Sequence, residues 1–326
     1  MTTCSVVIIT YNSEGDIKRC LDSVLDQRFD GEYEIIVADN NSQDDTRKIV
    51  RRSYPDLKLI EFEKNLGVSK GYNRAFEYAI GEYVVYLNPD TIVHRDWLRN
   101  LHAVINRTEA VAAHSCVFEP YHDEFNPSNL DEYPERRSMF ELNRYGFVED
   151  IYVPPVPRET LELSACSMII DRRFAEELDY LFDEEIPFTG EDLDLGLRLN
   201  SMGEAVVFAP HSIVYHNQNQ KKSVYSPRHL LCKYISLSEG RTIALYKTMT
   251  NSEFVDFLPM LLLGNILNVR IMHLNRIWMV ALYLFAIPLS ILSIVVSLVA
   301  FPRFAKKRQA VLSKQDASIY EAIQRR

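Results

Sequence analysis

Acidic side chains that could carry chemistry occur at two distant places in this sequence. Asn88-Pro89-Asp90 follows the apolar run 83–87, and Glu191-Asp192 lies within the run 188–194. A carboxylate such as Asp90 suits a hard divalent cation, which prefers oxygen ligands and could be held against a diphosphate. A carboxylate such as Asp192 could take a proton from an attacking hydroxyl. Together the two sites suggest metal-assisted group transfer with Asp192 as the general base.

Several of these side chains also have simpler interpretations. Asp90 could belong to an ordinary Asn-Pro-Asp turn, and Glu191 or Asp192 could cap the start of a helix. His216 precedes the polar segment 217–223 and could be a further metal ligand, or it could be purely structural. His211 is a weaker candidate for the same role. Asp194 and Arg198 stand four residues apart on a predicted helix, which favours an ion pair over chemistry.

Alternating strands and helices must position these side chains. Strands are expected at 5–10, 33–38, 57–62, 82–87, 161–170 and 205–209, and helices at 17–25, 46–52, 70–80 and 192–202. This alternation predicts a parallel sheet with right-handed crossovers, and such sheets bind ligands beyond the carboxyl ends of their strands. Polar clusters fall at those ends, at residues 10–12, 39–42, 65–67 and 88–90. Between 119 and 158 prolines interrupt the pattern, which predicts an excursion over the acceptor side.

Composition limits the kind of protein. The chain has 326 residues, 47% of them hydrophobic, which is enough for a full core. Its formal net charge of −9 argues against a nucleic-acid partner. Its five cysteines are scattered without a C-x-x-C pair, so they predict neither a disulfide framework nor a zinc knuckle and fit a reducing, cytosolic setting. The run 6–9 is too short for a signal peptide and predicts a buried first strand.

The C-terminal part has a different composition from about residue 248 onward. Residues 277–301 form a run of 25 without a charge, longer than the roughly 20 residues that cross a bilayer. Basic residues flank this run on both sides, so charge does not orient one crossing cleanly. We expect 248–326 to be a membrane-associated helical tail with a candidate transmembrane segment at 277–301. The alternatives are a segment lying in the membrane interface and a buried helix of a soluble protein.

A competing interpretation is hydrolytic. Gly67-Val68-Ser69-Lys70-Gly71 fits the G-x-S-x-G elbow of α/β-hydrolases, with Asp192 and His216 following in the right order. Against it, charged residues lead into the elbow and no oxyanion segment of the H-G-G type precedes it. Neither a G-x-G-x-x-G nor a P-loop motif occurs, so dehydrogenase and P-loop functions lack support.

Taken in order, the motifs resemble glycosyltransferase family 2, the inverting transferases of GT-A fold. The matching stretches are Ser5-Val6-Val7-Ile8-Ile9-Thr10-Tyr11-Asn12, Val37-Ala38-Asp39-Asn40-Asn41-Ser42-Gln43-Asp44-Asp45-Thr46, Asn65-Leu66-Gly67, Gly71-Tyr72-Asn73, Leu87-Asn88-Pro89-Asp90 and Gly190-Glu191-Asp192-Leu193-Asp194-Leu195. The resemblance covers about residues 4–245 and implies an α/β protein with a mixed sheet. It implies a GT-A domain at 1–247, with a Rossmann-like nucleotide-sugar half at 1–115 and an acceptor half at 116–247.

The resemblance also implies roles for single residues. Asp192 would be the general base, and Asp90 with His216 would bind Mg²⁺ or Mn²⁺ at the diphosphate. The nucleotide-sugar donor would be bound by a larger set: Thr10, Tyr11, Asn12, Asp39, Asn65, Gly67, Asn73 and Asn88. Asn88 stands where the family's usual D-x-D has its first carboxylate, so one metal ligand of that pattern is replaced.

The expected activity is hexosyl transfer at a membrane. Asn88-Pro89-Asp90 looks like the branch that includes rhamnosyltransferases using dTDP-rhamnose, although it does not fix the donor. A membrane-attached tail suggests an acceptor glycan on a polyprenyl or dolichyl carrier, with the catalytic domain on the cytoplasmic side of the cell membrane. The product could belong to a capsule, an O-antigen or a protein-linked glycan. A non-catalytic nucleotide-sugar sensor, which would keep Asp39 without needing Asp192, is a further alternative.

Overall fold

The structure is a computed structural model that describes residues 3–118, 137–146, 148–186, 189–217, 227–267 and 276–325. The chain divides into two compact units. Unit 1 comprises residues 1–139, 151–184 and 205–223, and unit 2 comprises residues 140–150, 185–204 and 224–326. Each unit is described by itself.

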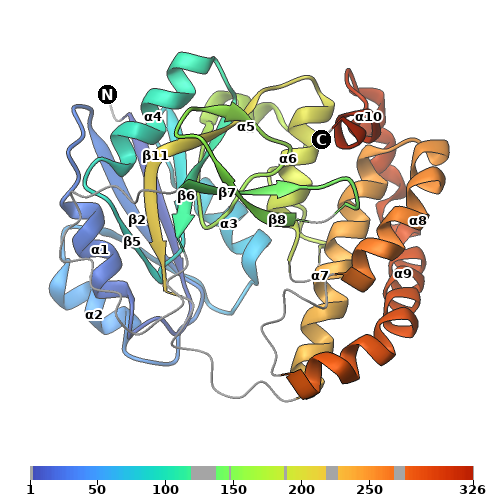
Figure 1. The fold of residues 1–326 in the computed structure, drawn as a ribbon. Coiled ribbons are helices and arrows are strands. Elements are labelled where there is room, and N and C mark those ends of the chain that lie inside the picture. Colours follow the sequence, from blue (N-terminus) through green and yellow to red (C-terminus); the bar gives the residue numbers. More distant parts are fainter. Residues whose placement is uncertain are drawn as a thin grey trace. The chain divides into compact units, whose positions relative to one another are not determined.

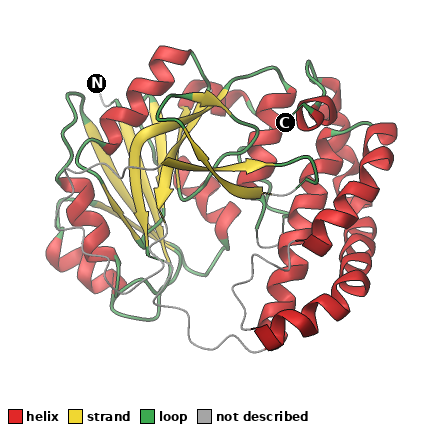
Figure 2. Cartoon of the chain, in the orientation of Figure 1, coloured by secondary structure: helices red, strands yellow, loops and turns green. Residues whose placement is uncertain are grey.

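A nine-stranded sheet is the centre of unit 1 (Figures 1 and 2), in the order β3-β2-β1-β4-β10-β6-β11-β5, with β9 paired to β11. Its strands are β1 (Cys4–Thr10), β2 (Tyr33–Asp39), β3 (Lys58–Glu61), β4 (Tyr83–Leu87), β5 (Thr91–Val93), β6 (Ala112–Phe118), β9 (Arg158–Glu159), β10 (Ser167–Asp171) and β11 (Val206–His216). The central strands are apolar and buried on both faces, as in a sheet covered by helices.

The helices of unit 1 connect and cover these strands. They are α1 (Ile17–Leu25), α2 (Thr46–Ser53), α3 (Val68–Phe76), α4 (Trp97–Thr108) and α5 (Arg172–Glu177). β1 pairs in parallel with both β2 and β4, and β2 pairs in parallel with β3. The carboxyl ends of these four strands therefore meet at one edge of the sheet.

The predicted parallel direction is correct for β1 to β4 and also for β6 and β11, which pair in parallel with each other. β10 is antiparallel to β4 and β6, and β5 is antiparallel to β11, so the sheet is mixed, as the family resemblance implied. Between 119 and 158 the prolines obscured a hairpin of β7 (Arg137–Leu142) and β8 (Val148–Val153). Residues 119–136, where most of the predicted excursion falls, lie outside the described residues. β11 extends seven residues beyond its predicted end at 209, with a register shift between Ala209 and Ile213.

Unit 2 is mainly helical (Figure 2). Its helices are α6 (Glu191–Ser201), α7 (Pro227–Thr248), α8 (Asn251–Leu267), α9 (Arg276–Ser313) and α10 (Ile319–Gln324). α7 packs against α6, α8 and α9, and its Ile243 forms a buried cluster with Ile186 and Phe304. The C-terminal end of α6 is tied to the chain before α10 because Asp316 donates its backbone N–H to the carbonyl of Ser201 at 2.7 Å.

The predicted transmembrane segment 277–301 lies within α9. The side chains of residues 276–290 fall outside the described part of the chain. Among the residues that are described, none of the helices combines the length and the apolar character needed to traverse a bilayer.

Candidate active site

Thr10 and Asp39 end neighbouring strands and are direct partners in the parallel β1–β2 register. Both are fully buried, and the Thr10 hydroxyl donates to Oδ1 of Asp39 at 3.0 Å. The backbone N–H of Ser42 donates to Oδ2 of the same carboxylate at 2.9 Å. Asp39 therefore fixes the turn after β2 through these two hydrogen bonds.

Arg47 was not singled out from the sequence. Its Nε lies 3.7 Å from Oδ2 of Asp39, and its Nη2 donates to the carbonyl of Ser42 at 2.8 Å. Its side chain is one-third exposed, so solvent reaches the guanidinium beside the carboxyl end of β2. The signal that could have found it is its position in the first turn of α2, directly after the loop that follows Asp39.

The loops after β1 and β2 are locked to each other. Asn12 donates its backbone N–H to the Ser42 hydroxyl at 2.9 Å and accepts from the Gln43 N–H at 2.8 Å through its side chain. Asn12 and Asn41 both have positive φ, of 52° and 66°, a conformation that asparagine tolerates better than most residues. Tyr11 is 44% exposed beside them, so its ring is accessible to a ligand.

The third polar loop, 65–67, is also built from side-chain to backbone bonds. The Asn65 side chain accepts from the Gly67 N–H at 2.8 Å, and Asn40 bonds both the Leu66 N–H and the Gly67 carbonyl. Gly67 has φ +80°, and a Cβ added there would meet nothing within 4 Å. Glycine is needed at this position for its backbone conformation, and space is left beside it.

Asn73 and Asn88 have bonding partners within unit 1. The Asn73 amide bonds both the N–H and the carbonyl of Phe182, at 3.0 and 2.9 Å. These bonds give Asn73 a structural role on α3, and its role in donor binding stays a prediction. Asn88 accepts from the Tyr72 hydroxyl at 3.1 Å, and its backbone N–H donates to the carbonyl of Cys166.

Asp90 and His216 are brought together although 126 residues separate them. His216 ends β11 opposite Thr91 of β5, and its Nε2 lies 3.2 Å from Oδ1 of Asp90. The backbone N–H of Asn217 donates to the Asp90 carbonyl at 2.7 Å, which fixes the turn from the main chain. Asp90 is more open than His216, with side-chain exposures of 29% and 11%. His211, the weaker candidate, instead bonds the carbonyl of Pro155 at 3.1 Å.

The charge of His216 is set by its surroundings. Burial alone would lower the pKa of His216, but Cys166 and the Asp90 carboxylate beside it raise that pKa to about 11. No sequence motif marked Cys166 as part of this site. It precedes β10, whose antiparallel pairing with β4 aligns it with Asn88.

The Asp90–His216 pair fits a diphosphate-bound cation. Carboxylate oxygen and neutral imidazole nitrogen are suitable ligands for Mn²⁺, and two protein ligands suffice when substrate phosphates and waters complete the shell. His216 would have to give up the proton that its raised pKa retains before it could bind the cation. Across the described segments, three or more His, Cys, Asp or Glu side chains never group closely enough to hold a metal by themselves. The site therefore offers part of a coordination shell, and the ligand would have to supply the rest.

The proposed base, Asp192, lies in the first turn of α6 in unit 2. Its Oδ1 accepts from the Leu193 N–H at 2.9 Å, and its side chain is half-buried. Gly190 precedes the helix with φ +103°, which turns the chain sharply into α6. Glu191 beside it is buried, and burial, followed by the Asp192 and Asp194 carboxylates, raises the pKa of Glu191 to about 8.

Glu191 gives unit 2 a measurable pH dependence. Its pKa is raised from an ordinary value of 4.5 to about 8 in the folded protein, so the folded state binds the extra proton between these values. The free energy of unfolding should therefore fall as pH rises through this window, by up to about 1.4 kcal/mol per pH unit. Urea unfolding from pH 5 to 8 should show this fall, and Glu191→Gln should flatten it. An equal slope in both proteins would contradict the assignment.

Asp194 is the centre of a buried charge network in unit 2. Arg198 Nε lies 2.9 Å from its Oδ2, which confirms the predicted i,i+4 ion pair. Lys247, near the end of α7, brings Nζ to 2.6 Å from Oδ1. Asp194 and Lys247 are fully buried and Arg198 is 2% exposed, so the network anchors the helix carrying Asp192 to α7.

α7 also contacts the turn that starts α6, where the two backbones approach each other closely. A Cβ added to Gly240 of α7 would lie 1.8 Å from the carbonyl oxygen of Thr189, and one added to Gly190 would lie 3.0 Å from the Gly240 carbonyl carbon. Glycine at 240 therefore lets α7 pass directly against the turn that starts α6.

Gly240→Ala should destabilise the protein by about 1–3 kcal/mol because the added methyl forces the two backbones apart. The same change in an open helix interior would stabilise by up to about 1 kcal/mol, so the sign of the effect is diagnostic. Urea unfolding of the full chain measures it. A stabilised Gly240→Ala variant would show that the close approach does not exist in solution.

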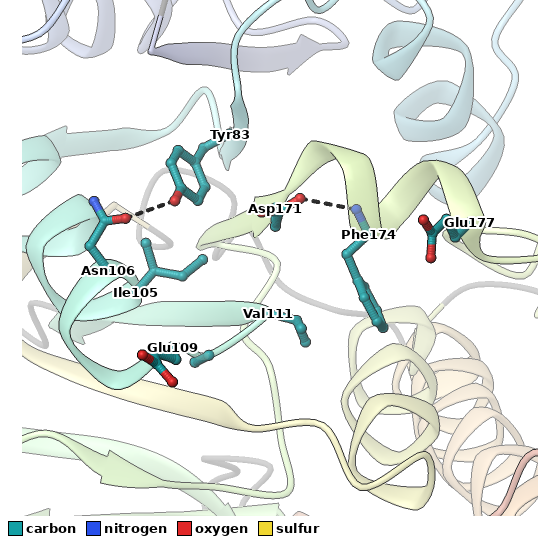
Figure 3. A pocket seen from close by; sticks show the side chains of 9 residues that line it. Tyr83, Ile105, Asn106, Glu109, Val111, Asp171, Phe174 and Glu177 are labelled. Atoms are coloured by element: carbon teal, nitrogen blue, oxygen red, sulfur yellow. Dashed lines mark hydrogen bonds between the residues drawn. The ribbon is translucent and has the colours of Figure 1, made fainter.

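A shallow cavity of about 410 Å³ lies at the opposite edge of the unit 1 sheet (Figure 3). Its lining includes Tyr83 at the start of β4 and Asp171 at the end of the antiparallel β10. Tyr83 donates to Asn106 at 2.7 Å, and Asp171 accepts from the Phe174 N–H at 3.0 Å. These positions mark the amino ends of the parallel strands, so the cavity is separate from the edge that carries Thr10 and Asp39.

The hydrolase interpretation does not fit the geometry. A nucleophile elbow requires the serine at a sharp turn directly after its strand. Here β3 ends at Glu61 and α3 begins at Val68, so Ser69 lies inside the first helical turn, where it is 7% exposed. His216, the proposed partner of that serine, instead contacts Asp90.

Known proteins share part of this sequence. The sequence profile of the family described as Glycosyl transferase family 2 matches residues 5–158, which include the Thr10–Asp39 edge and Asn88-Pro89-Asp90. Residues 5–158 are thus similar to a glycosyl transferase family 2 domain. The matches support a transferase enzyme, and they do not confirm the rhamnosyltransferase-like branch.

Curated relatives match over part of the chain. The glycosyltransferase SunS of Bacillus subtilis is 34% identical over 142 residues, 43% of this chain and 31% of the relative. The glycosyltransferase AglE of Haloferax volcanii is 32% identical over 108 residues, 32% of this chain and 36% of the relative. The chain spans about a third of the length of these relatives.

Solved structures support the GT-A-like fold with its mixed sheet. The mannosyltransferase PcManGT from Pyrobaculum calidifontis, in complex with GDP-Man and Mn²⁺, has a TM-score of 0.55 at 19% identity, covering 98% of this chain and 86% of that chain. TarS 1–349 of S. aureus in complex with UDP-GlcNAc has a TM-score of 0.55 at 20% identity, covering 84% of this chain and 74% of that chain. At these identities the likeness concerns the fold alone.

Proposed function

We propose that this protein is an inverting glycosyltransferase that moves a hexose from a nucleoside-diphosphate donor to a hydroxyl of an acceptor glycan. The observation that carries the proposal is the Asp90–His216 pair, at 3.2 Å, in a chain whose residues 5–158 match the glycosyl transferase family 2 profile. Asp90 follows β4, and the buried Thr10–Asp39 pair ends the neighbouring β1 and β2 of the same parallel set. A nucleotide at this edge would have the diphosphate near Asp90 and its nucleoside toward Asp39.

The proposed chemistry is direct displacement. The Asp192 carboxylate takes the proton of the acceptor hydroxyl, whose oxygen attacks the anomeric carbon while the bond to the diphosphate oxygen breaks. Attack from the side opposite the leaving group inverts the anomeric configuration. A divalent cation, when bound, would neutralise charge on the departing diphosphate. Asp90 and His216 would hold it, and Mn²⁺ is the ion present with two structural neighbours.

The acceptor and the location are part of the proposal. The uncharged run 277–301 suggests attachment to a membrane, and a polyprenyl- or dolichyl-linked glycan is a substrate for which such attachment is useful. The catalytic domain would then face the cytoplasm at the cell membrane. Rhamnose is one candidate sugar because of the Asn88-Pro89-Asp90 motif. Neighbours crystallised with UDP-GlcNAc and GDP-Man widen the set of donors to be tested.

The donor can be found by thermal stabilisation of the full chain, because a ligand that binds only the native state raises the melting temperature. Nucleotide sugars with uridine, guanosine and thymidine bases are screened with and without Mn²⁺. We expect one class to stabilise the protein, with a larger shift when Mn²⁺ is present. Asp90→Asn and His216→Ala should remove the Mn²⁺-dependent part of the shift and keep the remainder.

An exposed acidic residue of the same unit provides the matched control. Glu77 lies at the C-terminal end of α3. The Glu77→Gln variant should leave the Mn²⁺-dependent shift in melting temperature unchanged. Stabilisation by no nucleotide sugar in the panel, or a Mn²⁺ effect that survives both site variants, would contradict the proposal.

A further inference from the structure

The inward face of α9 is well packed within unit 2. Phe301 stacks on Tyr246 of α7 with ring centroids 3.7 Å apart, and Ser297 and Phe304 are buried along the same side. One turn further, Arg308 donates to the backbone carbonyls of Tyr246 and Met249, each at 2.7 Å. The positions 297, 301, 304 and 308 follow helical spacing and define the side of α9 that is committed to α7 and α8.

The opposite face of α9 exposes large aliphatic side chains. Its members are Ile291, Leu292, Val295, Leu298 and Val299, exposed by 45–74%. Residues 291, 295 and 299 lie four apart, so these side chains form one continuous stripe. Five adjacent exposed aliphatics on one stripe differ from single exposed apolar residues, which need no explanation. We call this stripe the outer α9 face.

The charges of α9 are segregated. The sequence 276–313 contains no Asp or Glu, although the whole chain has a net charge of −9. Arg303 and Lys306 are exposed and continue the stripe, because they lie four and seven residues beyond Val299. Burial raises the pKa of Glu239 on α7, and the nearby charge of Arg303 partly offsets that rise. The outer α9 face thus has an aliphatic half followed by a basic end.

We propose that the outer α9 face lies flat on the surface of an anionic membrane, with its aliphatic side chains among the acyl chains and its basic end at the lipid headgroups. Apolar side chains beside basic ones are the composition of helices that lie in a membrane interface. The buried inward face explains the orientation, since a helix packed along one side by α7 and α8 presents only its other side to lipid. A second copy would offer no acidic side chain on α9 to complement this basic end, whereas anionic lipid headgroups do, which favours lipid as the occupant.

This inference deepens the proposed function by stating how the protein would meet a lipid-linked acceptor, and it rests on that function only for its purpose. The binding needs no donor and no catalysis. If the protein binds vesicles but no nucleotide sugar stabilises it, the result would support this inference and contradict the proposed function.

Co-sedimentation of the full chain with vesicles tests the proposal. We expect binding to phosphatidylcholine vesicles in which about a third of the lipid is phosphatidylglycerol, and much weaker binding to phosphatidylcholine alone. Val295→Ser with Val299→Ser should weaken binding to both by at least about fivefold because apolar burial is lost. Arg303→Gln with Lys306→Gln should weaken binding to the anionic vesicles alone, by roughly fivefold per charge, and high salt should mimic this effect.

Two matched controls lie in unit 1. Ile80→Ser removes another exposed aliphatic side chain, 62% exposed, and Lys64→Gln removes another exposed cation. Neither should change binding. The proposal is overturned if the protein does not bind the anionic vesicles, or if the controls weaken binding as much as the α9 variants. It is also overturned if the valine variants dissociate a dimer without affecting vesicle binding, or if alkaline carbonate fails to release the protein from cell membranes, because that would indicate a crossing helix.

Discussion

Asp192→Asn is expected to slow sugar transfer by about a hundred- to ten-thousand-fold while nucleotide-sugar binding survives. Asparagine keeps the shape of the side chain and its ability to accept from the Leu193 N–H, so α6 should keep its first turn. It cannot take the proton of the acceptor hydroxyl. The loss should therefore appear in kcat, with the donor-induced rise in melting temperature unchanged.

The matched control for this prediction is Asp256→Asn, which neutralises an exposed carboxylate on α8 of the same unit. It should transfer sugar at the wild-type rate. Glu191→Gln distinguishes the role of Glu191 from that of its neighbour, and it should slow sugar transfer less than Asp192→Asn does. Full activity in Asp192→Asn would remove that residue from the role of base. A protein that binds donor but transfers no sugar in any variant, wild type included, would favour the non-catalytic sensor.

Asp194→Leu is expected to destabilise the protein by about 3–5 kcal/mol, more than any other change in the buried network. Asp194 balances two buried cations, with Arg198 at 2.9 Å and Lys247 at 2.6 Å. Removing the carboxylate leaves both positive charges in the interior without their shared counter-ion. Removing Lys247 instead leaves Asp194 and Arg198 as a neutral pair, so Lys247→Met should cost less.

Urea unfolding of the full chain measures this order. The double variant Asp194→Leu with Lys247→Met should recover part of the loss, because it removes one buried cation together with the carboxylate. Lys307→Met is a matched control, since Lys307 forms a half-exposed pair with Glu185 at 3.4 Å and should cost at most about 1 kcal/mol. A larger cost for Lys247→Met than for Asp194→Leu would contradict the charge balance described here.

Much of the unit 1 fold could be predicted because local signals and tertiary packing agree there. The run 5–10 is apolar and short, and the helix that follows it has Ile17, Leu21 and Val24 on one buried face. Strand direction could not be predicted for β10 and β5, because an antiparallel partner leaves no mark on local periodicity. The hairpin β7–β8 was missed for a related reason, since prolines and charges near its strands hide their alternation.

For the candidate site, the sequence predicted which residues lie at strand ends, but it did not predict all of their bonding partners. Thr10, Asp39 and Asp90 lie at strand ends as expected, and His216 reaches Asp90 because β11 runs seven residues longer than predicted. Arg47 and Cys166 were not predicted, because only the tertiary pairing brings them to the edge. Lys247 was likewise invisible, since its contact with Asp194 joins residues 53 positions apart.

The anomeric configuration of the first product tests the central proposal most directly. With the donor identified by thermal stabilisation, ¹H NMR can follow transfer to water or a simple alcohol and read the configuration before mutarotation. A single displacement by an oxygen that Asp192 deprotonates predicts the anomer opposite to that of the donor. A first product with the donor's own configuration would contradict it.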